Sequence, residues 1–423
     1  MNHFIDNKIM PFAVKFSTNK VLVAIRDGLS LTMILAIVGS IFMLLASLPI
    51  PGWPEYLDRI GLSQYLWKGV ESTFSLVGLI ASFSVAWSYA KQHQQDGVAI
   101  GIIALCAFIT VTPFIKQENI SGITIGYLGA KGMFTAIIIA LTTTHIYKFF
   151  IDRDIRIKLP DSVPPAVSRS FVALIPGVVI LTFWLVVYAL LDVFHLPNAH
   201  DLITTILGGP IHFLGGSVFG TAMIVALNSL FWFVGINGGS AVNSIMAPVW
   251  LGNLQTNMDA YKAGQPMTEI FTQPFMDNYV YMGGGGATLG LVIAITLIAR
   301  RKRASKRTKA IAPLTLVPGL FNINEPAMFG LPIVLNVFLL IPFVLTPVVN
   351  LFIAYFATVM GLLPYTRATA TWTMPPIISG FLTTGSIKAS ILQFILIVID
   401  ILIYIGFYAA IEKSYLKEEK DNA

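Results

Sequence analysis

The sequence predicts an all-α integral membrane protein with about ten transmembrane helices and additional re-entrant hairpins. Hydrophobic residues make up 56% of its 423 residues and charged residues only 11%, whereas an ordinary soluble domain carries about 25% charged residues. The apolar residues gather in runs close to the roughly 20 residues that a helix needs to cross a bilayer. Lysine and arginine are clumped between these runs. This composition argues against a water-soluble enzyme, a disordered chain and a nucleic-acid-binding protein.

Nine apolar runs are the candidate spans. They cover residues 29–50, 70–90, 98–115, 132–151, 171–194, 215–234, 283–299, 337–360 and 389–410. The first run is too long for the core of a signal peptide, and no small-residue cleavage site follows it, so we count it as a span.

Four segments rich in lysine and arginine predict the orientation of the spans. They contain Lys8, Lys15, Lys20 and Arg26; Arg153, Arg156, Lys158 and Arg169; Arg300, Arg301, Lys302, Arg303, Lys306, Arg307 and Lys309; and Lys413, Lys417 and Lys420. Because short loops rich in these residues stay in the cytoplasm, these segments and both termini are expected inside. Residues 51–69, whose charges balance, and residues 195–212, which hold no lysine or arginine, are expected outside.

The order of the spans requires one more crossing. Six spans return the chain to the inside near Gly235, and the span 283–299 must begin outside because the basic residues follow it. Residues 235–282 therefore cross once, although they contain no clean apolar run of 20 residues. We expect a broken or re-entrant crossing, which is tolerated where it lines a cavity or is buried in protein.

Two further stretches, 311–336 and 362–385, are apolar but interrupted by proline and glycine. Interrupted segments are the usual sequence indication of a binding site near the middle of the membrane. All the irregular stretches follow residue 230, whereas the first five spans look like plain helices. The sequence therefore predicts a scaffold half, residues 1–195, and a half that holds the binding site, residues 196–423.

The strongest candidate for a functional side chain is Glu325, in the stretch Asn324-Glu325-Pro326. It lies between apolar residues, and an ionisable group at membrane depth costs a few kcal/mol on insertion scales, so it is expected to line a polar cavity. Pro326 disfavours helix at Glu325 and leaves backbone groups near Asn324 free to face a ligand. The alternative is a solvated carboxylate at the mouth of a loop.

A second candidate is the glycine-rich break that follows Trp232. Gly238 and its neighbouring glycines permit close approach of the backbone, and the amide of Asn237 suits hydroxyl groups better than a metal ion. Trp372 could lie against the apolar face of a sugar ring. For both tryptophans the alternative is an aromatic belt at the membrane surface.

Other features indicate structure or stay open. The glycines of 283–286 with Gly290 favour close helix packing rather than a phosphate cradle. Asp400 is a proton relay or a buried partner of a polar group, and Arg26 with Asp27 predicts a local ion pair. One cysteine, Cys106, and six scattered histidines predict neither a disulfide framework nor a metal site, and no cofactor is expected.

At these residues the sequence resembles the membrane-embedded EIIC component of the bacterial phosphotransferase system, in the lactose/cellobiose/diacetylchitobiose group. The resemblance covers most of the chain. It is carried by Lys8-Ile9-Met10-Pro11, Ala24-Ile25-Arg26-Asp27-Gly28, Leu159-Pro160-Asp161-Ser162-Val163-Pro164-Pro165-Ala166-Val167, the break 235–238, Asn324-Glu325-Pro326 with Phe329-Gly330-Leu331-Pro332-Ile333-Val334-Leu335-Asn336, and the Trp372 region.

The resemblance implies a homodimer formed through the N-terminal helices, ten transmembrane helices with re-entrant hairpins, and a sugar site in the C-terminal half. It implies that Glu325 contacts the sugar hydroxyl that becomes phosphorylated and that Trp232 and Trp372 pack on the sugar. Known members of the group carry histidine where this chain has Asn237. Asparagine holds a hydroxyl but does not shuttle a proton near neutral pH, so more of the role falls on Glu325.

The resemblance also implies a small soluble EIIB partner whose phosphocysteine is the phosphoryl donor. Cys106 lies in an apolar span and only a short tail follows the last span, so EIIB is expected to be a separate chain. The expected function is uptake of a β-linked disaccharide across the bacterial cell membrane, with phosphorylation only together with EIIB. The alternatives are an ion-coupled secondary transporter of sugars or other small solutes, an intramembrane enzyme and a channel.

Overall fold

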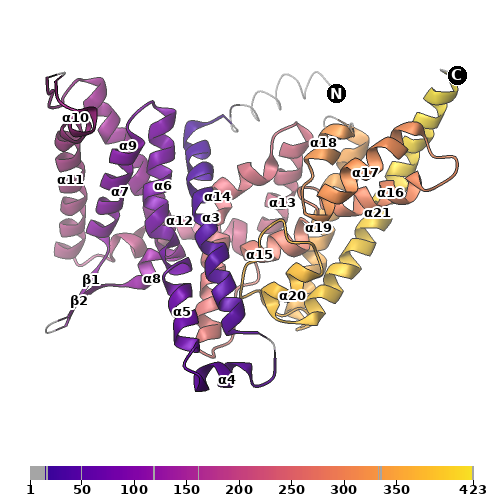
Figure 1. The fold of residues 1–423 in the computed structure, drawn as a ribbon, viewed down its shortest axis with the longest axis horizontal. Helices are drawn as coiled ribbons and strands as arrows, with labels where there is room; N and C mark the ends of the chain where they lie inside the picture. The colour runs from indigo at the N-terminus through magenta and orange to yellow at the C-terminus, as the bar shows by residue number, and fades with distance from the viewer. Residues whose placement is uncertain are drawn as a thin grey trace.

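The computed structural model describes residue 15 and residues 18–48, 50–117, 120–160, 162–331, 333 and 336–421. Of the motifs quoted above, residues 8–11, Asp161, Pro332, Val334 and Leu335 lie outside the described residues. The fold is helical, as predicted, and Figure 1 shows the N-terminal helices on one side of the molecule and the C-terminal elements on the other, with α13 and α14 between them.

The elements follow one another in this order. The first part contains α3 (Lys20–Ala46), α4 (Trp53–Arg59), α5 (Ser63–Glu71), η2 (Phe74–Leu76), α6 (Val77–Gln92), α7 (Gly97–Val111), β1 (Phe114–Gln117), β2 (Ile120–Ile123), α8 (Ile125–Leu128), η3 (Ala130–Gly132), α9 (Met133–Asp152), α10 (Pro165–Val172) and α11 (Leu174–Val193). The second part contains α12 (Ala199–Gly216), α13 (Val218–Phe233), α14 (Gly238–Lys262), α15 (Gln273–Phe275), the π-helical turn η4 (Met276–Val280), α16 (Leu289–Ala299), α17 (Lys306–Leu320), α18 (Glu325–Gly330), α19 (Val337–Val359), α20 (Ile378–Thr384) and α21 (Ile387–Asp421).

Each of the nine predicted spans corresponds to an apolar helix. Within the described residues, six helical segments are long and apolar enough to cross a membrane: Lys20–Ala46, Ser63–Gln92, Ala130–Asp152, Leu174–Val193, Phe338–Val359 and Ile387–Asp421. The other three runs form the shorter apolar helices Gly97–Val111, Val218–Phe233 and Leu289–Ala299.

The stretch 235–282 corrects one prediction, because its first part is an unbroken helix. Helix α14 runs for 25 residues and includes Pro248. Its polar residues bind the main chain of irregular segments: the Asn253 amide donates to the carbonyl of Phe271 at 2.7 Å, and the Asn257 amide donates to the carbonyls of Glu269 at 2.7 Å and Thr366 at 3.0 Å. A crossing helix can therefore be polar where neighbouring backbone groups need partners.

The span predicted for 283–299 is also corrected at its start. Gly283, Gly284 and Gly286 have φ angles of 84°, 93° and 78°, so this run is a loop, and α16 begins only at Leu289. Gly290, inside α16, does show the expected close packing, because a Cβ atom there would overlap Asp400 of α21.

The elements that were not predicted include a strand hairpin and a long helix. Strands β1 and β2 form a small antiparallel hairpin in which Phe114 pairs with Ile123. Residues 195–212, expected as an outer loop, contribute to the 18-residue helix α12, whose N-cap Asn198 accepts hydrogen bonds from the main chain of His200 and Asp201. A helix cap of this kind stabilises the first turn without any apolar periodicity in the sequence.

Two large hydrophobic clusters form the interior. One is built mainly from α3, α6, α7, α9 and α11, and the other from α13, α14, α16, α19 and α21. Helix α14 contributes Trp250 to the second cluster and Ala247 to the first, so it lies where the two clusters meet. The irregular segments contribute to the second cluster, for example through Phe271 and Met328.

Helix α21 connects these irregular segments along one side. The Gln393 amide group accepts from the main chain of Ile377 and Gly380 and donates to the carbonyl of Asn278, at 2.7, 2.9 and 2.8 Å. Farther along the same helix, Tyr404 donates to the carbonyl of Gly286 at 2.6 Å. The Glu412 carboxylate, near the C-terminal end, accepts from the main chain of Ser305 at 2.6 Å and from the Thr308 hydroxyl at 2.5 Å.

Candidate functional site

The glycine loop, residues 283–286, is the centre of the candidate site. The Gly283 N–H donates to Oδ1 of Asn322 at 2.7 Å, and the Gly283 carbonyl accepts from the Thr288 hydroxyl at 2.6 Å. Tyr404 holds the other end of the loop through the Gly286 carbonyl. The left-handed angles at three of its residues explain why glycine is needed there.

Two asparagines before Glu325 tie this loop to the Trp372 segment. The Asn322 amide donates to the carbonyls of Trp372 at 2.7 Å and Met374 at 3.0 Å. The Asn324 amide donates to the carbonyl of Gly285 at 3.3 Å. Both asparagines are buried, and three segments far apart in the sequence therefore converge here.

Trp232 packs against the same loop from α13. Its side chain is only 5% exposed, so it belongs to the interior and not to an aromatic belt. A Cβ atom at position 285 would overlap the indole nitrogen, which shows how closely the ring approaches the loop. That nitrogen is buried and has no hydrogen-bond partner within the described residues.

Glu325 is the first residue of α18 and directly follows the buried Asn324. Its side chain is exposed, and its carboxylate makes no hydrogen bond or ion pair with any part of the chain that the structure describes. Trp372 is also exposed, to 46%, while its carbonyl is fixed by Asn322. Both side chains are therefore exposed, while hydrogen bonds of the Trp372 main chain and of the Asn324 side chain beside Glu325 tie the two segments to Asn322 and to the glycine loop.

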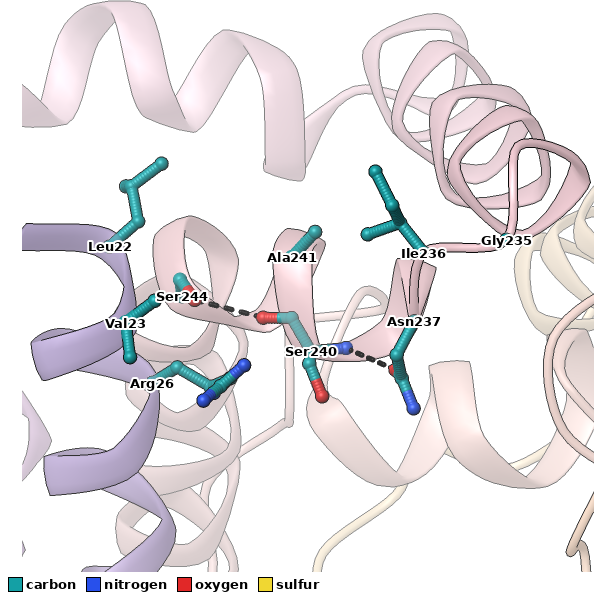
Figure 2. A pocket seen from close by; sticks show the side chains of 9 residues that line it. All are labelled: Leu22, Val23, Arg26, Gly235, Ile236, Asn237, Ser240, Ala241 and Ser244. Carbon is teal, nitrogen blue, oxygen red and sulfur yellow. Dashed lines mark hydrogen bonds between the residues drawn. The ribbon is translucent and has the colours of Figure 1, made fainter. Parts of the chain in front are cut away.

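Asn237 and Gly238 lie at the start of α14, and Asn237 lines a cavity there. The Asn237 side chain caps the helix by accepting from the Ser240 N–H at 2.8 Å. Gly238 is buried, and a Cβ atom there would overlap the carbonyl of Asn228. Asn237 lines a cavity of about 300 Å³ together with Arg26 of α3 (Figure 2).

The lining of that cavity does not include the other predicted site residues. The structure thus brings together Trp232, Asn324 and the main chain of Trp372 around the glycine loop. Within the described residues, no hydrogen bond joins Asn237 or Gly238 to them. The sequence analysis did not select the glycine loop or Tyr404 as part of the site. The loop is recognised by its positive φ angles, and Tyr404 by its contact with the loop in the folded protein.

The remaining candidates have structural partners. Arg26 and Asp27 form the expected ion pair at 2.7 Å. Asp400 is fully buried and accepts from the Asn350 amide at 3.1 Å. This contact is the one expected if Asp400 is the buried partner of a polar group. Among the described residues, no group of three or more His, Cys, Asp and Glu side chains is placed to hold a metal ion.

Comparison with known proteins gives a consistent result. The profile of the family described as "Phosphotransferase system, EIIC" matches residues 26–347. The chain is 38% identical to the lichenan permease IIC component of Bacillus subtilis (strain 168), over 100% of this chain and 96% of that protein. It is 39% identical to the cellobiose-specific EIIC component of the phosphotransferase system of Geobacillus stearothermophilus, over 99% and 97% of the two chains.

A solved structure is similar over the whole length. The crystal structure of the transporter ChbC, the IIC component of the N,N'-diacetylchitobiose-specific phosphotransferase system, superimposes with a TM-score of 0.92 at 37% sequence identity and covers 99% of both chains. The predicted resemblance and the fold class are confirmed. The chain therefore belongs to the EIIC family of multi-pass membrane sugar transporters of the phosphotransferase system, in its cellobiose/chitobiose-type group.

Proposed function

We propose that the protein imports a β-linked disaccharide, of the cellobiose or diacetylchitobiose type, across the bacterial cell membrane while phosphorylated EIIB transfers its phosphoryl group to the sugar. The relatives named above are lichenan, cellobiose and diacetylchitobiose components, and all three carbohydrates consist of β-linked hexose units. This shared chemistry supports the substrate class. In this scheme EIIB is a separate chain, and both termini of the transporter are cytoplasmic.

One observation carries the assignment of the sugar site: an unpaired, exposed carboxylate, Glu325, directly follows an asparagine that is fixed to the glycine loop beside Trp232. In the proposed complex Trp232 and Trp372 contact the faces of the sugar rings, because aromatic rings pack well against their apolar C–H groups. Asn237, Gly238, Asn324 and Glu325 bind hydroxyl groups. Asn237 joins the other residues only if its segment approaches the glycine loop during transport.

In the proposed reaction Glu325 orients or deprotonates the attacking hydroxyl, at C6 of the sugar. Phosphoryl transfer in line with the leaving phosphocysteine requires mainly positioning and stabilisation of negative charge. The product carries up to two negative charges, which makes its return through an apolar pathway costly. Phosphorylation would therefore make uptake irreversible.

The proposed transport cycle moves the C-terminal half against a scaffold formed by the N-terminal half. The scaffold helices also form the contact between two copies in a homodimer, and lipid surrounds the remaining apolar surface. Support comes from the two hydrophobic clusters, which are largely separate and meet at α14. Each cluster can remain packed while their relative position changes.

The function is tested with purified protein, a panel of sugars (cellobiose, diacetylchitobiose, lactose and gentiobiose) and phosphorylated EIIB. We expect Glu325→Gln to abolish phosphorylation of the sugar that binds while changing its dissociation constant by less than about threefold, since an amide retains hydrogen bonding but is no base. Glu55→Gln, on the loop expected outside, is the control. Full phosphorylation by the Glu325→Gln variant would refute the role of Glu325 as base. Uptake into proteoliposomes without a phosphoryl donor that collapses with an uncoupler would instead favour ion-coupled transport.

A further inference from the structure

Apart from Asn237, the residues that line the cavity at the start of α14 have no part in the proposed sugar site. One wall comes from α3, through Arg26 and two apolar neighbours. The other comes from the loop before α14 and the first turns of that helix, between residues 235 and 244 (Figure 2). The polar side chains of the lining are Arg26, Asn237, Ser240 and Ser244. Arg26 is the one charged residue among those that line it, and no carboxylate does. The cavity of about 300 Å³ is therefore suited to an anion.

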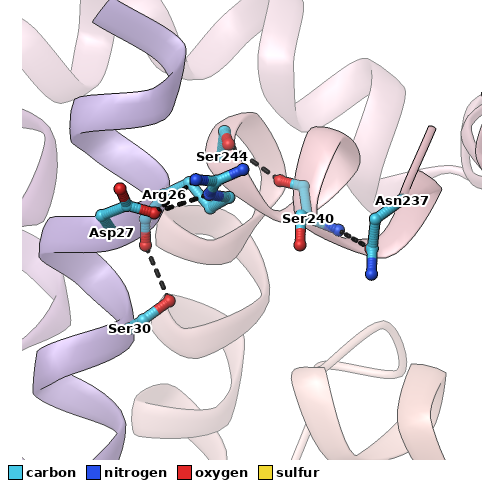
Figure 3. A network of polar contacts seen from close by, with 6 residues as sticks. All are labelled: Arg26, Asp27, Ser30, Asn237, Ser240 and Ser244. Atoms are coloured by element: carbon cyan, nitrogen blue, oxygen red, sulfur yellow. Dashed lines mark hydrogen bonds and ion pairs between the residues drawn. The ribbon is translucent and has the colours of Figure 1, made fainter. Parts of the chain in front are cut away.

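Arg26 is held in place from the side away from α14. One carboxylate oxygen of Asp27 accepts from both Nε and Nη2 of Arg26, each at 2.7 Å. Figure 3 shows the guanidinium group between Asp27 and Ser240. A guanidinium group has five N–H donors, so the contact with Asp27 leaves most of them available to the cavity.

The opposite wall adds further donors. The Asn237 side chain uses its oxygen to cap α14, which leaves its NH₂ group unpaired within the described residues. Ser244 donates to the carbonyl of Ser240 at 2.8 Å, whereas the Ser240 hydroxyl has no partner in the part of the chain that the structure describes. A phosphate monoester carries up to two negative charges and three acceptor oxygens, and a guanidinium with neighbouring hydroxyl and amide donors matches it well.

The predicted topology places this cavity at the cytoplasmic side of the membrane, where phosphorylated EIIB would act. Arg26 follows the basic N-terminal segment, and the span order returns the chain to the inside at Gly235, so both walls belong to the cytoplasmic end. We propose that this cavity binds the phosphoryl group of the phosphorylated sugar before its release, with Arg26 as its principal ligand. The proposal rests on the proposed function, and it assigns to Arg26 and Ser240 a role that is separate from binding of the uncharged sugar.

The test measures binding of cellobiose, cellobiose 6-phosphate and inorganic phosphate to the full-length protein in a neutral detergent. We expect Arg26→Gln to weaken binding of cellobiose 6-phosphate by roughly tenfold or more, as loss of a charge-assisted contact implies, and to leave binding of cellobiose unchanged. Inorganic phosphate should compete with cellobiose 6-phosphate in the wild type but not in Arg26→Gln. Arg26→Lys keeps the charge but not the two-pronged geometry, so an intermediate loss is expected.

Arg156→Gln is the matched control. Arg156 also pairs with a neighbouring carboxylate, that of Asp154, and its side chain is exposed to the same extent as that of Arg26, 37%. This variant should bind all three ligands as the wild type does.

Several results would overturn the proposal. Unchanged affinity of Arg26→Gln for cellobiose 6-phosphate would do so, and so would equal loss of the sugar and its phosphate, which would assign Arg26 to the fold or the sugar site. Displacement of inorganic phosphate by phosphatidylglycerol micelles but not by cellobiose 6-phosphate would assign the cavity to a lipid headgroup. If neither sugar ligand binds but inorganic phosphate still binds in an Arg26-dependent manner, the anion site stands and the proposed substrate fails.

Discussion

Single side chains that never touch the sugar determine the shape of the proposed site. Tyr404 is the clearest example, because its hydroxyl donates to the carbonyl of Gly286 while its ring is fully buried. Removing that hydroxyl leaves a buried carbonyl without its partner, which costs about 1–3 kcal/mol. The glycine loop that supports Trp232 and Asn324 would then lose one of its fixed ends.

We therefore expect Tyr404→Phe to weaken sugar binding several-fold through the loop while the phosphorylation rate at saturating sugar stays close to that of the wild type. The dissociation constant of the sugar and the maximal rate with phospho-EIIB are measured separately. Tyr408→Phe is the control, because Tyr408 contacts Thr308, at the start of α17, and not the loop. Equal loss of sugar affinity in both variants would show that the effect arises from general destabilisation.

The sequence did not predict which residues surround each candidate side chain. Trp232 and Asn324 were expected in one site, and both contact the glycine loop. The glycines of that loop were expected to pack a helix, because residue spacing alone does not distinguish a helical glycine from one with a positive φ angle. Asn237 was expected in the same site as Glu325; in the structure it caps α14 and lines the cavity with Arg26.

At the scale of elements, helix caps and buried polar contacts decide where segments lie. The start of α12 is held against α7 by His200, which is 1% exposed, contacts the Thr112 hydroxyl through Nε2 at 2.9 Å and stacks on Tyr127. Burial lowers the pKa of His200 to about 4, despite the opposing effect of Asp201. The neutral imidazole is therefore the form that the fold accommodates.

This pKa predicts a loss of stability in acid. Because the unfolded chain binds a proton at about pH 6.5 and the folded chain only near pH 4, the contribution of His200 is complete above pH 6.5 and is lost as the pH falls towards 4. The full loss is about 3 kcal/mol. We expect thermal unfolding of the protein in detergent to show this decline and His200→Gln to flatten it; an unchanged pH profile in the variant would contradict the assignment.

Apolar runs allowed the nine hydrophobic helices to be predicted, since their length follows from the thickness of the bilayer. Helix α14 escaped prediction as a continuous helix because Asn253 and Asn257 make it polar, and they are stable there only through the main chain of segments distant in the sequence. The start of α16 was misplaced for a related reason: glycines extend an apolar run without extending its helix. Pairwise contacts between segments were not available from the sequence alone.

At the scale of the whole molecule, two hydrogen bonds within the described residues join α3 and its C-cap directly to residues 367–369 of the C-terminal half. The Thr369 N–H donates to the Ser40 hydroxyl of α3 at 3.0 Å, and the Arg367 guanidinium donates to the carbonyl of Ser47 at 3.2 Å. Two hydrogen bonds of this kind can be exchanged during a rigid-body movement. The proposed alternating access requires that they break.

This requirement is tested by cross-linking in a Cys106→Ala background. We expect the pair Ser40→Cys and Thr369→Cys to form a cross-link that stops sugar uptake and that a reducing agent reverses, because the bond would fix the C-terminal half to α3. The control pair, Thr272→Cys and Thr366→Cys, lies within the C-terminal half, where the two hydroxyls are 2.5 Å apart, and its cross-link should leave uptake intact. Normal uptake with the first pair fully cross-linked would exclude movement at this contact.

The row of hydrogen-bonding side chains along α21 has a genetic consequence. Asp400, Tyr404, Tyr408 and Glu412 recur every fourth residue, so they form one stripe on the helix. Asp400 binds α19, Tyr404 binds the glycine loop, and Tyr408 and Glu412 both bind the start of α17. Genetic selection for sugar uptake should therefore reject mutations at these four positions, including those that do not contact the glycine loop. The opposite side of the same helix, where Leu402 is 67% exposed, should accept almost any apolar replacement.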